Sequence, residues 1–278
     1  MTAILEAQTR VWLTKPYATL SDFDIRDGSV DILTFPVTNK GFDIGFALSP
    51  RAIRAAQRLR YEVFSLEMGH HVKEEDDARG LDIDEFDEQM MHIVAVCQTS
   101  QRIIATYRIQ TDEQARKHGR FYSATEFDLE PLIAQKEADG ILELGRACVA
   151  KAYRNTGAIF YLWKTIRLYM ELYDKRWIMG CCSISTQDPV LAWRTFYALK
   201  HGGHVNPDLC VDAIGDYHLP APDINFEEAD DIKIPKLFKI YLKLGTQVIS
   251  YPAIDKAFGT IDFLALNDEQ AVRLANLG

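Results

Sequence analysis

The 278-residue sequence has no segment typical of a membrane-spanning, exported or disordered chain. No run reaches the roughly 18 uninterrupted apolar residues that a spanning helix requires, and residues 1–20 hold no continuous apolar stretch behind a basic start. The 16 glycines and 10 prolines are spread thinly, so no stretch is typical of a low-complexity linker. These features predict a globular protein that is soluble or at most peripheral to a membrane.

Cysteine is scarce and lacks the spacing of a metal or redox motif. The five cysteines are odd in number and include no C-x-x-C pair. Most of them fall inside apolar runs, which is typical of reduced, buried thiols in a cytoplasmic protein. They are Cys97, Cys148, Cys181, Cys182 and Cys210.

Basic charge is also in short supply. The sequence has 31 Lys and Arg against 40 Asp and Glu, and a formal net charge of -9 does not suit a nucleic-acid partner. It contains no nucleophile elbow, Walker loop or dinucleotide-binding glycine fingerprint, which argues against hydrolase, nucleoside-triphosphate and dinucleotide chemistry. The seven histidines are scattered and no EF-hand spacing occurs, so we expect no bound metal.

Hydrophobic periodicity begins with a strand and a helix. Alternation over residues 42–48 predicts a strand that is buried on one face. The Ser49-Pro50 pair predicts the start of a helix that ends near Gly69. Arg60 lies at the edge of the apolar stripe of this helix, so a guanidinium borders the expected core.

The rest of the pattern alternates strands and helices. The order implies an α/β sandwich, a mixed central sheet with helices on both faces. We expect an N-terminal extension over residues 1–40, a core over residues 41–215 and a C-terminal extension over residues 216–278 that packs on the core. The expected elements are a hairpin of strands at 91–97 and 102–109, strands at 141–149 and 176–185, and helices at 158–176 and 190–203.

Two segments carry little regular pattern. Residues 73–89 are strongly acidic, which predicts a solvated loop without regular structure. This loop contains Asp84 and Asp87. Residues 111–140 are mixed in composition and predict short helices.

Isolated charges occur in apolar strands. Glu143 and Arg146 interrupt the strand at 141–149, and Arg108 occurs in the same way at the end of the hairpin. Buried ionised groups are costly unless they are paired or used, so the three residues form either structural ion pairs or a functional site. Strict alternation sends Glu143 and Arg146 to opposite faces unless Gly145 carries a bulge.

The junction AKAYRNTGA, between the strand at 141–149 and the following helix, has the features of a phosphate site. A helix N-terminus presents free N–H groups and a partial positive charge, and Gly157 lets the backbone approach a ligand closely. Lys151 and Arg154 add full positive charges. The spacing alone is equally compatible with a plain connection.

Several long sequence motifs occur one after another along the chain. They are RYEVF at 60–64, TYRI at 106–109, FYSATEFDLEPL at 121–132, LELGRACVAKAYR at 142–154 and MGCCS at 179–183. In these motifs and their order, the sequence resembles the ornithine lipid N-acyltransferases, the acyl-carrier-protein:L-ornithine enzymes, from Phe42 to about Leu266. The family is related to the acyl-homoserine lactone synthases. The resemblance implies the GNAT-type acyltransferase fold.

The resemblance also implies a set of site residues. The related families share an Arg…Phe pair, an Asp-x-x-Asp pair, an Arg and a Glu-x-x-Arg pair. In this sequence these positions are Arg60, Phe64, Asp84, Asp87, Arg108, Glu143 and Arg146.

The implied reaction moves a long-chain (3-hydroxy)acyl group from acyl carrier protein to the α-amine of an amino acid. L-Ornithine is the implied acceptor and a lyso-ornithine lipid the product. No cofactor is bound permanently, because the acyl-phosphopantetheine of the carrier is the donor. The implied donor-binding residues are Val149, Arg154, Asn155, Thr156, Gly157 and Ala158. Ile159 occupies a position that is small in the usual GNAT loop, which favours a carrier protein over acyl-CoA, the alternative donor.

The chemistry assigns roles to these residues. Glu143 is the expected base that takes the amine proton, its pKa raised by desolvation, and the backbone N–H of Val149 is the expected oxyanion donor. Arg60, Arg108 and Arg146 compete for the acceptor's carboxylate, and the sequence does not rank them. Asp84 and Asp87 hold these arginines or a second amine of the acceptor.

Two further basic features suggest partners. An acidic carrier would be attracted to cations near the donor loop, expected to be Lys151, Arg154, Lys164, Arg167, Lys175 and Arg176. The segment 231–245 predicts an amphipathic helix with Lys236, Lys239 and Lys243. This helix contacts an anionic membrane, packs on the core or docks the carrier.

Other functions fit the same residues. The acceptor could be another amino acid, such as glycine or tyrosine, or the precursor of a homoserine lactone. A non-enzymatic scaffold that only binds acyl carriers is a further alternative. Glu143 and Arg154 together argue against that scaffold.

Overall fold

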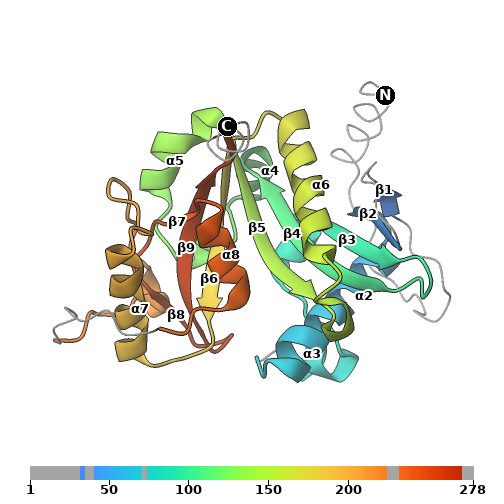
Figure 1. The fold of residues 1–278 in the computed structure, drawn as a ribbon, viewed down its shortest axis with the longest axis horizontal. Helices are drawn as coiled ribbons and strands as arrows, with labels where there is room; N and C mark the ends of the chain where they lie inside the picture. Colours follow the sequence, from blue (N-terminus) through green and yellow to red (C-terminus); the bar gives the residue numbers. More distant parts are fainter. Residues whose placement is uncertain (1–31, 35–40, 71–73, 224–231, 271–278) are drawn as a thin grey trace.

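The computed structural model describes residues 32–34, 41–70, 74–223 and 232–270 (Figure 1). Most of the expected N-terminal extension, residues 1–40, lies outside the described residues. The described part of it is β1 (Ile32–Thr34), which pairs antiparallel with β2 (Phe42–Ala47). Within the described segments, no helix has the length and apolar character needed to cross a bilayer.

A mixed sheet organises the described part of the chain, as the alternation of elements predicts. The strand order is β1-β2-β3-β4-β5-β6-β9-β7, and β8 pairs with β9 beside this path. β5 and β6 are parallel, whereas the other paired strands are antiparallel. The additional strands are β3 (Met91–Cys97), β4 (Ile103–Thr111), β5 (Ile141–Val149), β6 (Trp177–Ile184), β7 (Gln247–Val248), β8 (Ala253–Asp255) and β9 (Thr260–Asp268).

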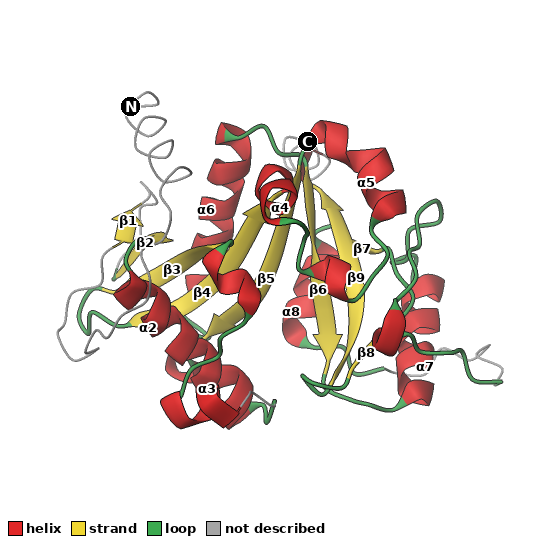
Figure 2. Cartoon of the chain, turned by 180° about the vertical axis from the view of Figure 1, so that it is seen from behind, coloured by secondary structure: helices red, strands yellow, loops and turns green. Residues whose placement is uncertain are grey.

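β5 and β6 separate after a short parallel contact. Their register ends at Glu143 opposite Met179, although the strands continue to Val149 and Ile184. Figures 1 and 2 show the two strands diverging beyond this contact. We call the region between the diverging ends the splay. Backbone groups that face the splay are not used by the β5–β6 ladder, so their hydrogen bonds go to other partners.

Helices cover both faces of the sheet, as predicted. α6 (Ala158–Leu172) buries Leu162 and Ile166 in a core that includes residues of β2 to β5. α2 (Pro50–Arg60) buries Ala52 and Ala56 in a second core with other residues of β3 and β4. Figures 1 and 2 view these two faces.

The N-terminal helix begins and ends as its sequence predicts. The Ala52 N–H donates to Ser49 Oγ at 3.2 Å, which caps α2. A π-helical turn, Tyr61–Glu67, continues the helix, and Gly69 follows with φ of 77°. This left-handed conformation suits glycine and ends the helical segment.

The prediction that the acidic segment at 73–89 lacks regular structure was wrong. It contains α3 (Glu74–Arg79) and a short 3-10 turn, Glu85–Glu88. Acidic residues in a first helical turn interact favourably with the helix dipole, so their concentration there favours a helix. Asp84 and Asp87 form a capping box on the 3-10 turn.

Short helices occupy residues 111–140, as predicted. They are α4 (Asp112–His118), the 3-10 turn Ser123–Thr125 and α5 (Glu130–Lys136). α4 carries a capping box formed by Thr111 and Gln114. The 3-10 turn lies at the edge of the splay and reappears in the site below.

The C-terminal segment is built into the central sheet. β9 pairs with β6 over the whole length of β6, and β7 and β8 pair with β9. α7 (Pro189–His201) and α8 (Lys236–Lys243) pack over this part of the sheet. The described residues of the expected C-terminal extension, 216–223 and 232–270, therefore include strands of the central sheet.

The five cysteines are free thiols, as their spacing predicts. Cys97, Cys148 and Cys182 are buried. Cys181 is half-buried and Cys210 is exposed, so the chain has one surface cysteine among its described residues.

Candidate active site

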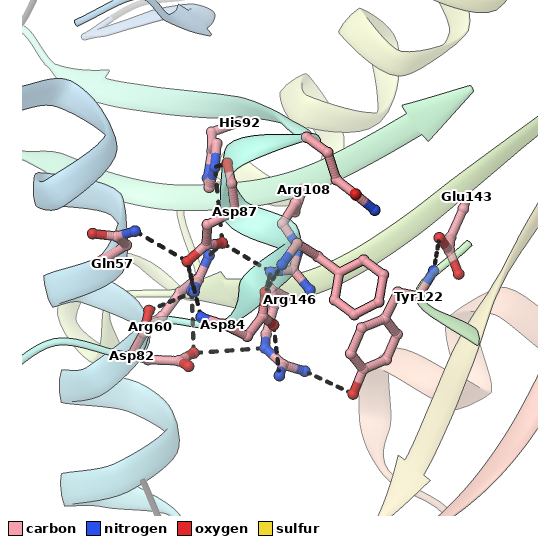
Figure 3. Close-up of polar contacts among 12 residues, drawn as sticks. Gln57, Arg60, Asp82, Asp84, Asp87, His92, Arg108, Tyr122, Glu143 and Arg146 are labelled. Atoms are coloured by element: carbon pink, nitrogen blue, oxygen red, sulfur yellow. Dashed lines mark hydrogen bonds and ion pairs between the residues drawn. The ribbon is translucent and has the colours of Figure 1, made fainter. Parts of the chain in front are cut away.

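Three arginines from three elements converge on one short acidic segment (Figure 3). The arginines come from α2, β4 and β5, and the aspartates come from the connection between α3 and β3. We call this set the charged network. Its members are Arg60, Arg108, Arg146, Asp82, Asp84 and Asp87. The structure thus brings together five residues that the sequence singled out and adds Asp82.

Arg60 ties α2 to the acidic segment. Its Nε donates to Asp82 Oδ2 at 3.1 Å, and Nη1 and Nη2 donate to the Asp87 carboxylate at 2.6 and 2.8 Å. Burial by itself lowers the pKa of Arg60, but Asp87 and Asp82 outweigh burial and raise that pKa above its usual value. The guanidinium is fully buried, so Arg60 serves the network rather than a ligand.

Asp87 lies at the centre of the network. It also accepts hydrogen bonds from Arg108 Nη1 at 2.8 Å and from Gln57 Nε2 at 3.0 Å. Burial alone would raise the pKa of the Asp87 carboxyl, but Arg60 and Arg108 hold it well below its usual range. Arg108 is 1% exposed, and its Nη1 donates to both Asp84 and Asp87, whereas its buried Nε has no hydrogen-bond partner among the described residues.

Asp84 has two structural duties. It caps the 3-10 turn by accepting the Phe86 N–H at 2.9 Å, and it receives Arg108 and Arg146 on its two oxygens. Of the two roles left open for Asp84 and Asp87, the structure shows the first: both carboxylates hold arginines.

A bulge in β5 redirects Arg146. The β4–β5 register shifts between Thr106 and Arg108, so Tyr107 is opposed by two residues, Arg146 and Ala147. Arg146 has φ of 50°, a left-handed conformation that few non-glycine residues adopt. The bulge thus lies at Arg146, one residue beyond Gly145, the position at which the sequence left a bulge open.

Arg146 is the accessible arginine of the network. Its side chain is 14% exposed, compared with 0% for Arg60 and 1% for Arg108. The guanidinium lies between the rings of Tyr122 and Phe258, at 5.1 and 4.7 Å from their centroids. Its Nη2 donates to Asp84 at 3.1 Å. The structure thus ranks the three arginines by exposure, and Arg146 is the most exposed of them.

Glu143 is buried beside the splay. Its Oε2 accepts the Tyr122 N–H at 2.8 Å and its Oε1 accepts the Ser123 N–H at 2.7 Å. Burial raises the pKa of the Glu143 carboxyl, and these hydrogen bonds only partly oppose that rise. Each carboxylate oxygen has two acceptor positions, so these two backbone bonds do not fill the hydrogen-bonding capacity of the carboxylate.

Val149 presents its backbone to the splay. It lies opposite Ala105, next to the position where the Ala150 N–H donates to the Ile104 carbonyl at 2.8 Å. Because hydrogen-bonded and non-bonded pairs alternate in an antiparallel ladder, the Val149 N–H and carbonyl point away from β4. The Val149 carbonyl accepts Arg154 Nε at 3.2 Å from that side.

The loop after β5 has the expected geometry at its glycine. Gly157 has φ of 80° and is the N-cap of α6, without a side-chain cap. Arg154 is held by Glu67, to which Nη1 and Nη2 donate at 2.6 and 2.7 Å. Thr156 Oγ1 donates to the Tyr153 carbonyl at 2.6 Å, and Asn155 is exposed. An anion at this helix end therefore competes with Glu67 for Arg154.

The cations expected around this loop are divided between the two ends of α6. Lys151, Arg154 and Lys164 are exposed and lie in the loop or early in the helix. Arg167, Lys175 and Arg176 lie at or beyond the last turns and pair with Glu269, Asp112 and Asp268, respectively. The prediction of one cluster of six was wrong, because the length of α6 separates its ends.

Some residues of the site were not singled out from the sequence. Asp82 and Tyr122 had a signal, since Asp82 precedes Asp84 by two positions and Tyr122 lies in the FYS motif. Phe258 lies in the segment IPKLFKIYLKLGTQVISYPAIDKAFGTIDF, which also matches the family, whereas His92, which contacts the Asp87 carbonyl at 3.2 Å, had no such signal. Phe258 reaches Arg146 from the distant C-terminal region, which only the tertiary fold shows.

Comparison with known proteins identifies the family and the fold of the chain. The model of the acetyltransferase (GNAT) domain matches residues 59–164, which include all six residues of the charged network and Glu143. The solved structure of FeeM, an N-acyl amino acid synthase from uncultured soil microbes, superposes with a TM-score of 0.52 at 11% identity. That superposition covers 85% of this chain and 98% of FeeM, and it shows the same fold.

Curated relatives are similar over most of their length. An L-ornithine N(alpha)-acyltransferase of Rhodobacter capsulatus is 33% identical over 241 residues, covering 83% of this chain and 91% of the relative. A protein of the same name from Brucella abortus is 33% identical over 231 residues, covering 79% of this chain and 82% of the relative. The expected acyltransferase activity and GNAT fold are thus confirmed, and the chain belongs to the L-ornithine N(alpha)-acyltransferase family.

Proposed function

We propose that this protein transfers a long-chain (3-hydroxy)acyl group from acyl carrier protein to the α-amine of L-ornithine. The product is a lyso-ornithine lipid. The observation that carries the proposal is the placement of Arg146: it is the accessible arginine of the charged network, and the bulge directs it to Tyr122, the residue that Glu143 also contacts. A cation for a carboxylate therefore lies close to a buried base at the edge of the splay.

The acceptor's carboxylate binds to Arg146. The planar guanidinium of arginine matches a carboxylate with two parallel hydrogen bonds. Contacts with the rings of Tyr122 and Phe258 fix the orientation of the Arg146 guanidinium. Arg60, Arg108, Asp84 and Asp87 act as positioning residues, since they fix Arg146 through Asp84 and tie β4, β5 and α2 together.

Glu143 serves as the base. It takes a proton from the α-ammonium, directly or through a water, and the neutral amine nitrogen attacks the thioester carbonyl carbon. The carbon–sulfur bond breaks as the intermediate collapses, and the thiolate of the carrier leaves and takes up the second proton that the attacking nitrogen loses as it becomes an amide. The raised pKa of the Glu143 carboxyl suits this exchange near neutral pH.

The Val149 N–H stabilises the oxyanion of the tetrahedral intermediate. Its orientation away from β4 supports this role, because a backbone donor that faces the splay requires no reorganisation. The donor's phosphodiester binds at the N-terminus of α6, with Arg154, Asn155, Thr156, Gly157 and Ala158 around it.

A carrier protein is the preferred donor over acyl-CoA. Lys151, Arg154 and Lys164 supply positive charge for an acidic partner. Leu66 and Met68, the neighbours of Glu67, are 68% and 48% exposed, and Phe160 in the first turn of α6 is 56% exposed. Apolar side chains rimmed by cations are the composition expected of a carrier docking surface.

The function is tested with purified protein, palmitoyl carrier protein and a pool of amino acids. Mass spectrometry of the products should show N-palmitoyl-ornithine as the main species. Another acylated amino acid in the same reaction would reassign the acceptor. Release of the carrier without any acylated amino acid would contradict the proposal.

Contact with the cytoplasmic face of a membrane completes the proposal. α8 buries Phe238 and Leu242, and Tyr241 meets the Tyr107 hydroxyl, so its apolar side packs on the core. Its lysines at 236, 239 and 243 are exposed, and each can add about 1 kcal/mol of attraction to an anionic leaflet. In vesicle sedimentation, a variant with all three lysines changed to Gln should lose binding to anionic vesicles. Failure of the unaltered protein to sediment with them would contradict membrane contact.

A further inference from the structure

Three buried carboxylates meet beyond the charged network. Glu126 follows the 3-10 turn Ser123–Thr125, Asp255 ends β8 and Asp262 lies in β9. One oxygen from each residue lies within 4.8 Å of the others. Their exposed fractions are 0%, 5% and 4%, so all three are more than nine-tenths buried. We call them the carboxylate triad.

Two oxygens of the triad lack a hydrogen-bond donor, although the side chains of Tyr122 and Ser183 donate toward Glu126 and Asp262, respectively. Glu126 Oε1 and Asp262 Oδ1 have no hydrogen-bond partner among the described residues, although both atoms are buried. Asp262 Oδ2 accepts Thr260 Oγ1 at 3.2 Å, and Asp255 Oδ1 accepts the Phe258 N–H at 2.8 Å. Orphaned acceptors of this kind are rare in proteins and call for an explanation, such as a bound cation.

The triad is also short of positive charge. Burial raises the pKa of the Glu126 carboxyl well above its usual value, and the neighbouring carboxylates raise it further. Burial likewise raises the pKa of Asp262 to about 6. Arg146 acts on both groups, but it is already paired with Asp84. One arginine therefore does not balance three carboxylates.

The triad is connected to the proposed catalytic residues across the splay. Cys181 of β6 donates toward Glu126 Oε2 at 3.8 Å and contacts Ser123 Oγ at 3.6 Å. The Ser123 N–H in turn binds Glu143. Arg146 approaches from β5 and Asp262 from β9, so an acceptor that binds both would cross the splay near Glu143.

We infer that the carboxylate triad binds the terminal ammonium of a diamino acid acceptor, which is ornithine if the proposed function holds. An ammonium has three N–H donors, and at about 2.8 Å from three oxygens its acceptors lie about 4.6 Å apart, in agreement with the triad. Arg146 holds the carboxylate at one end of the acceptor, and the triad holds the second amine at the other. The α-amine between them faces the donor.

The inference is tested by comparing two acceptors. L-Norvaline has the carbon chain of ornithine but no second amine. A site built for a polar group rejects an analogue that lacks it, so the unaltered protein should prefer ornithine over norvaline by at least about 100-fold in kcat/KM. The variants Glu126→Gln and Asp262→Asn should each lose about 100-fold in kcat/KM for ornithine. Both variants should keep their norvaline activity within about threefold.

The norvaline reaction also reports on folding and on chemistry. The exposed residues Glu130 and Asp216 provide matched controls. Glu130→Gln and Asp216→Asn should leave kcat/KM unchanged for both ornithine and norvaline. Equal loss for both acceptors in Glu126→Gln and Asp262→Asn would overturn the inference, as would equal use of the two acceptors by the unaltered protein. Acylation of norvaline but not ornithine would refute the ammonium site, whereas acylation of neither would refute the proposed function itself.

A divalent cation is the competing occupant of three carboxylates. Titration with Mn²⁺ distinguishes it from an ammonium. We expect Mn²⁺ titrations of the unaltered protein and of Glu126→Gln to show no saturable binding at the triad. We also expect a chelator to leave the activity unchanged. Binding that the variant abolishes, together with activity that depends on it, would overturn the ammonium site in favour of a metal.

Discussion

Glu143 and Arg146 both contact Tyr122, although residues three apart in a strand point to opposite faces. The left-handed conformation of Arg146 accounts for this, because the extra bulge residue reverses the alternation of side chains. A carboxylate and a guanidinium of one strand thereby reach the same edge of the splay. The strain of the bulge is stored where the proposed chemistry occurs.

The first prediction concerns Glu143. Glu143→Gln keeps the shape of the side chain and removes the base, so turnover should fall by a factor on the order of 10² to 10⁴. The KM for the acyl donor should stay unchanged, because Glu143 does not face the donor loop. Steady-state kinetics checks this, with Glu130→Gln as the matched surface control. Near-normal turnover of the variant at neutral pH would remove Glu143 from the mechanism.

The second prediction concerns Arg146. Arg146→Lys retains the positive charge but loses the planar fork and its stacking between Tyr122 and Phe258. The KM for ornithine should rise about 10- to 100-fold, with an unchanged KM for the acyl donor. Arg120→Lys, at an exposed ion pair with Glu85, is the control. A rise in donor KM alone would show that Arg146 serves the donor instead.

The third prediction concerns the donor loop. Arg154→Ala should lower kcat/KM for the acyl carrier about tenfold or more, since a charge-assisted contact to the phosphodiester is lost. Glu67→Gln should act in the opposite direction, because it releases Arg154 from its present partner. Both effects should shrink in high salt. Equal kcat/KM for acyl-CoA and acyl carrier, without any salt dependence, would contradict a carrier protein as the donor.

The fourth prediction concerns stability and pH. Burial lowers the pKa of His92 to about 4, from an ordinary value near 6.5. As pH falls below about 6.5, His92 takes up a proton in the unfolded chain but not in the native protein. The free energy of unfolding therefore decreases as pH falls from about 6.5 to about 4, the pKa of His92 in the folded protein. Between pH 7 and 4.5 this contribution amounts to about 2–3 kcal/mol.

Urea unfolding of the unaltered protein and of His92→Gln measures how much His92 contributes to the pH dependence of stability. The free energies of unfolding of the two proteins should converge as pH falls from 7 to 4.5, because glutamine does not titrate. Cooperative transitions with equal m-values make the comparison valid. A difference that stays constant over this range would show that His92 is not neutral in the folded protein.

The sequence predicted the charged network better than the shape of the site. Arg108 and Glu143 stood out because isolated charges in apolar strands need partners, and those partners are what the fold provides. The sequence left open a bulge at Gly145, because glycine is favoured at bulges, and the structure has the bulge one residue later, at Arg146. Local preference was overridden by the pairing of β4 with β5.

The carboxylate triad lay beyond sequence reasoning. Glu126 and Asp262 are far apart in the chain, and each alone is typical of a surface residue. They meet because β9 inserts beside β6, a topology that the pattern of strands does not specify. Burial of these residues is therefore a tertiary property, as is the approach of Phe258 to Arg146.

Isotope labelling shows directly whether the protein acylates ornithine at its α-amine. Ornithine labelled with ¹⁵N at the α position is incubated with the protein and an acyl carrier thioester, and the product is examined by NMR. The labelled nitrogen should become an amide with one attached proton, while the terminal amine stays free. A product whose labelled nitrogen remains an amine would contradict acylation at the α-amine.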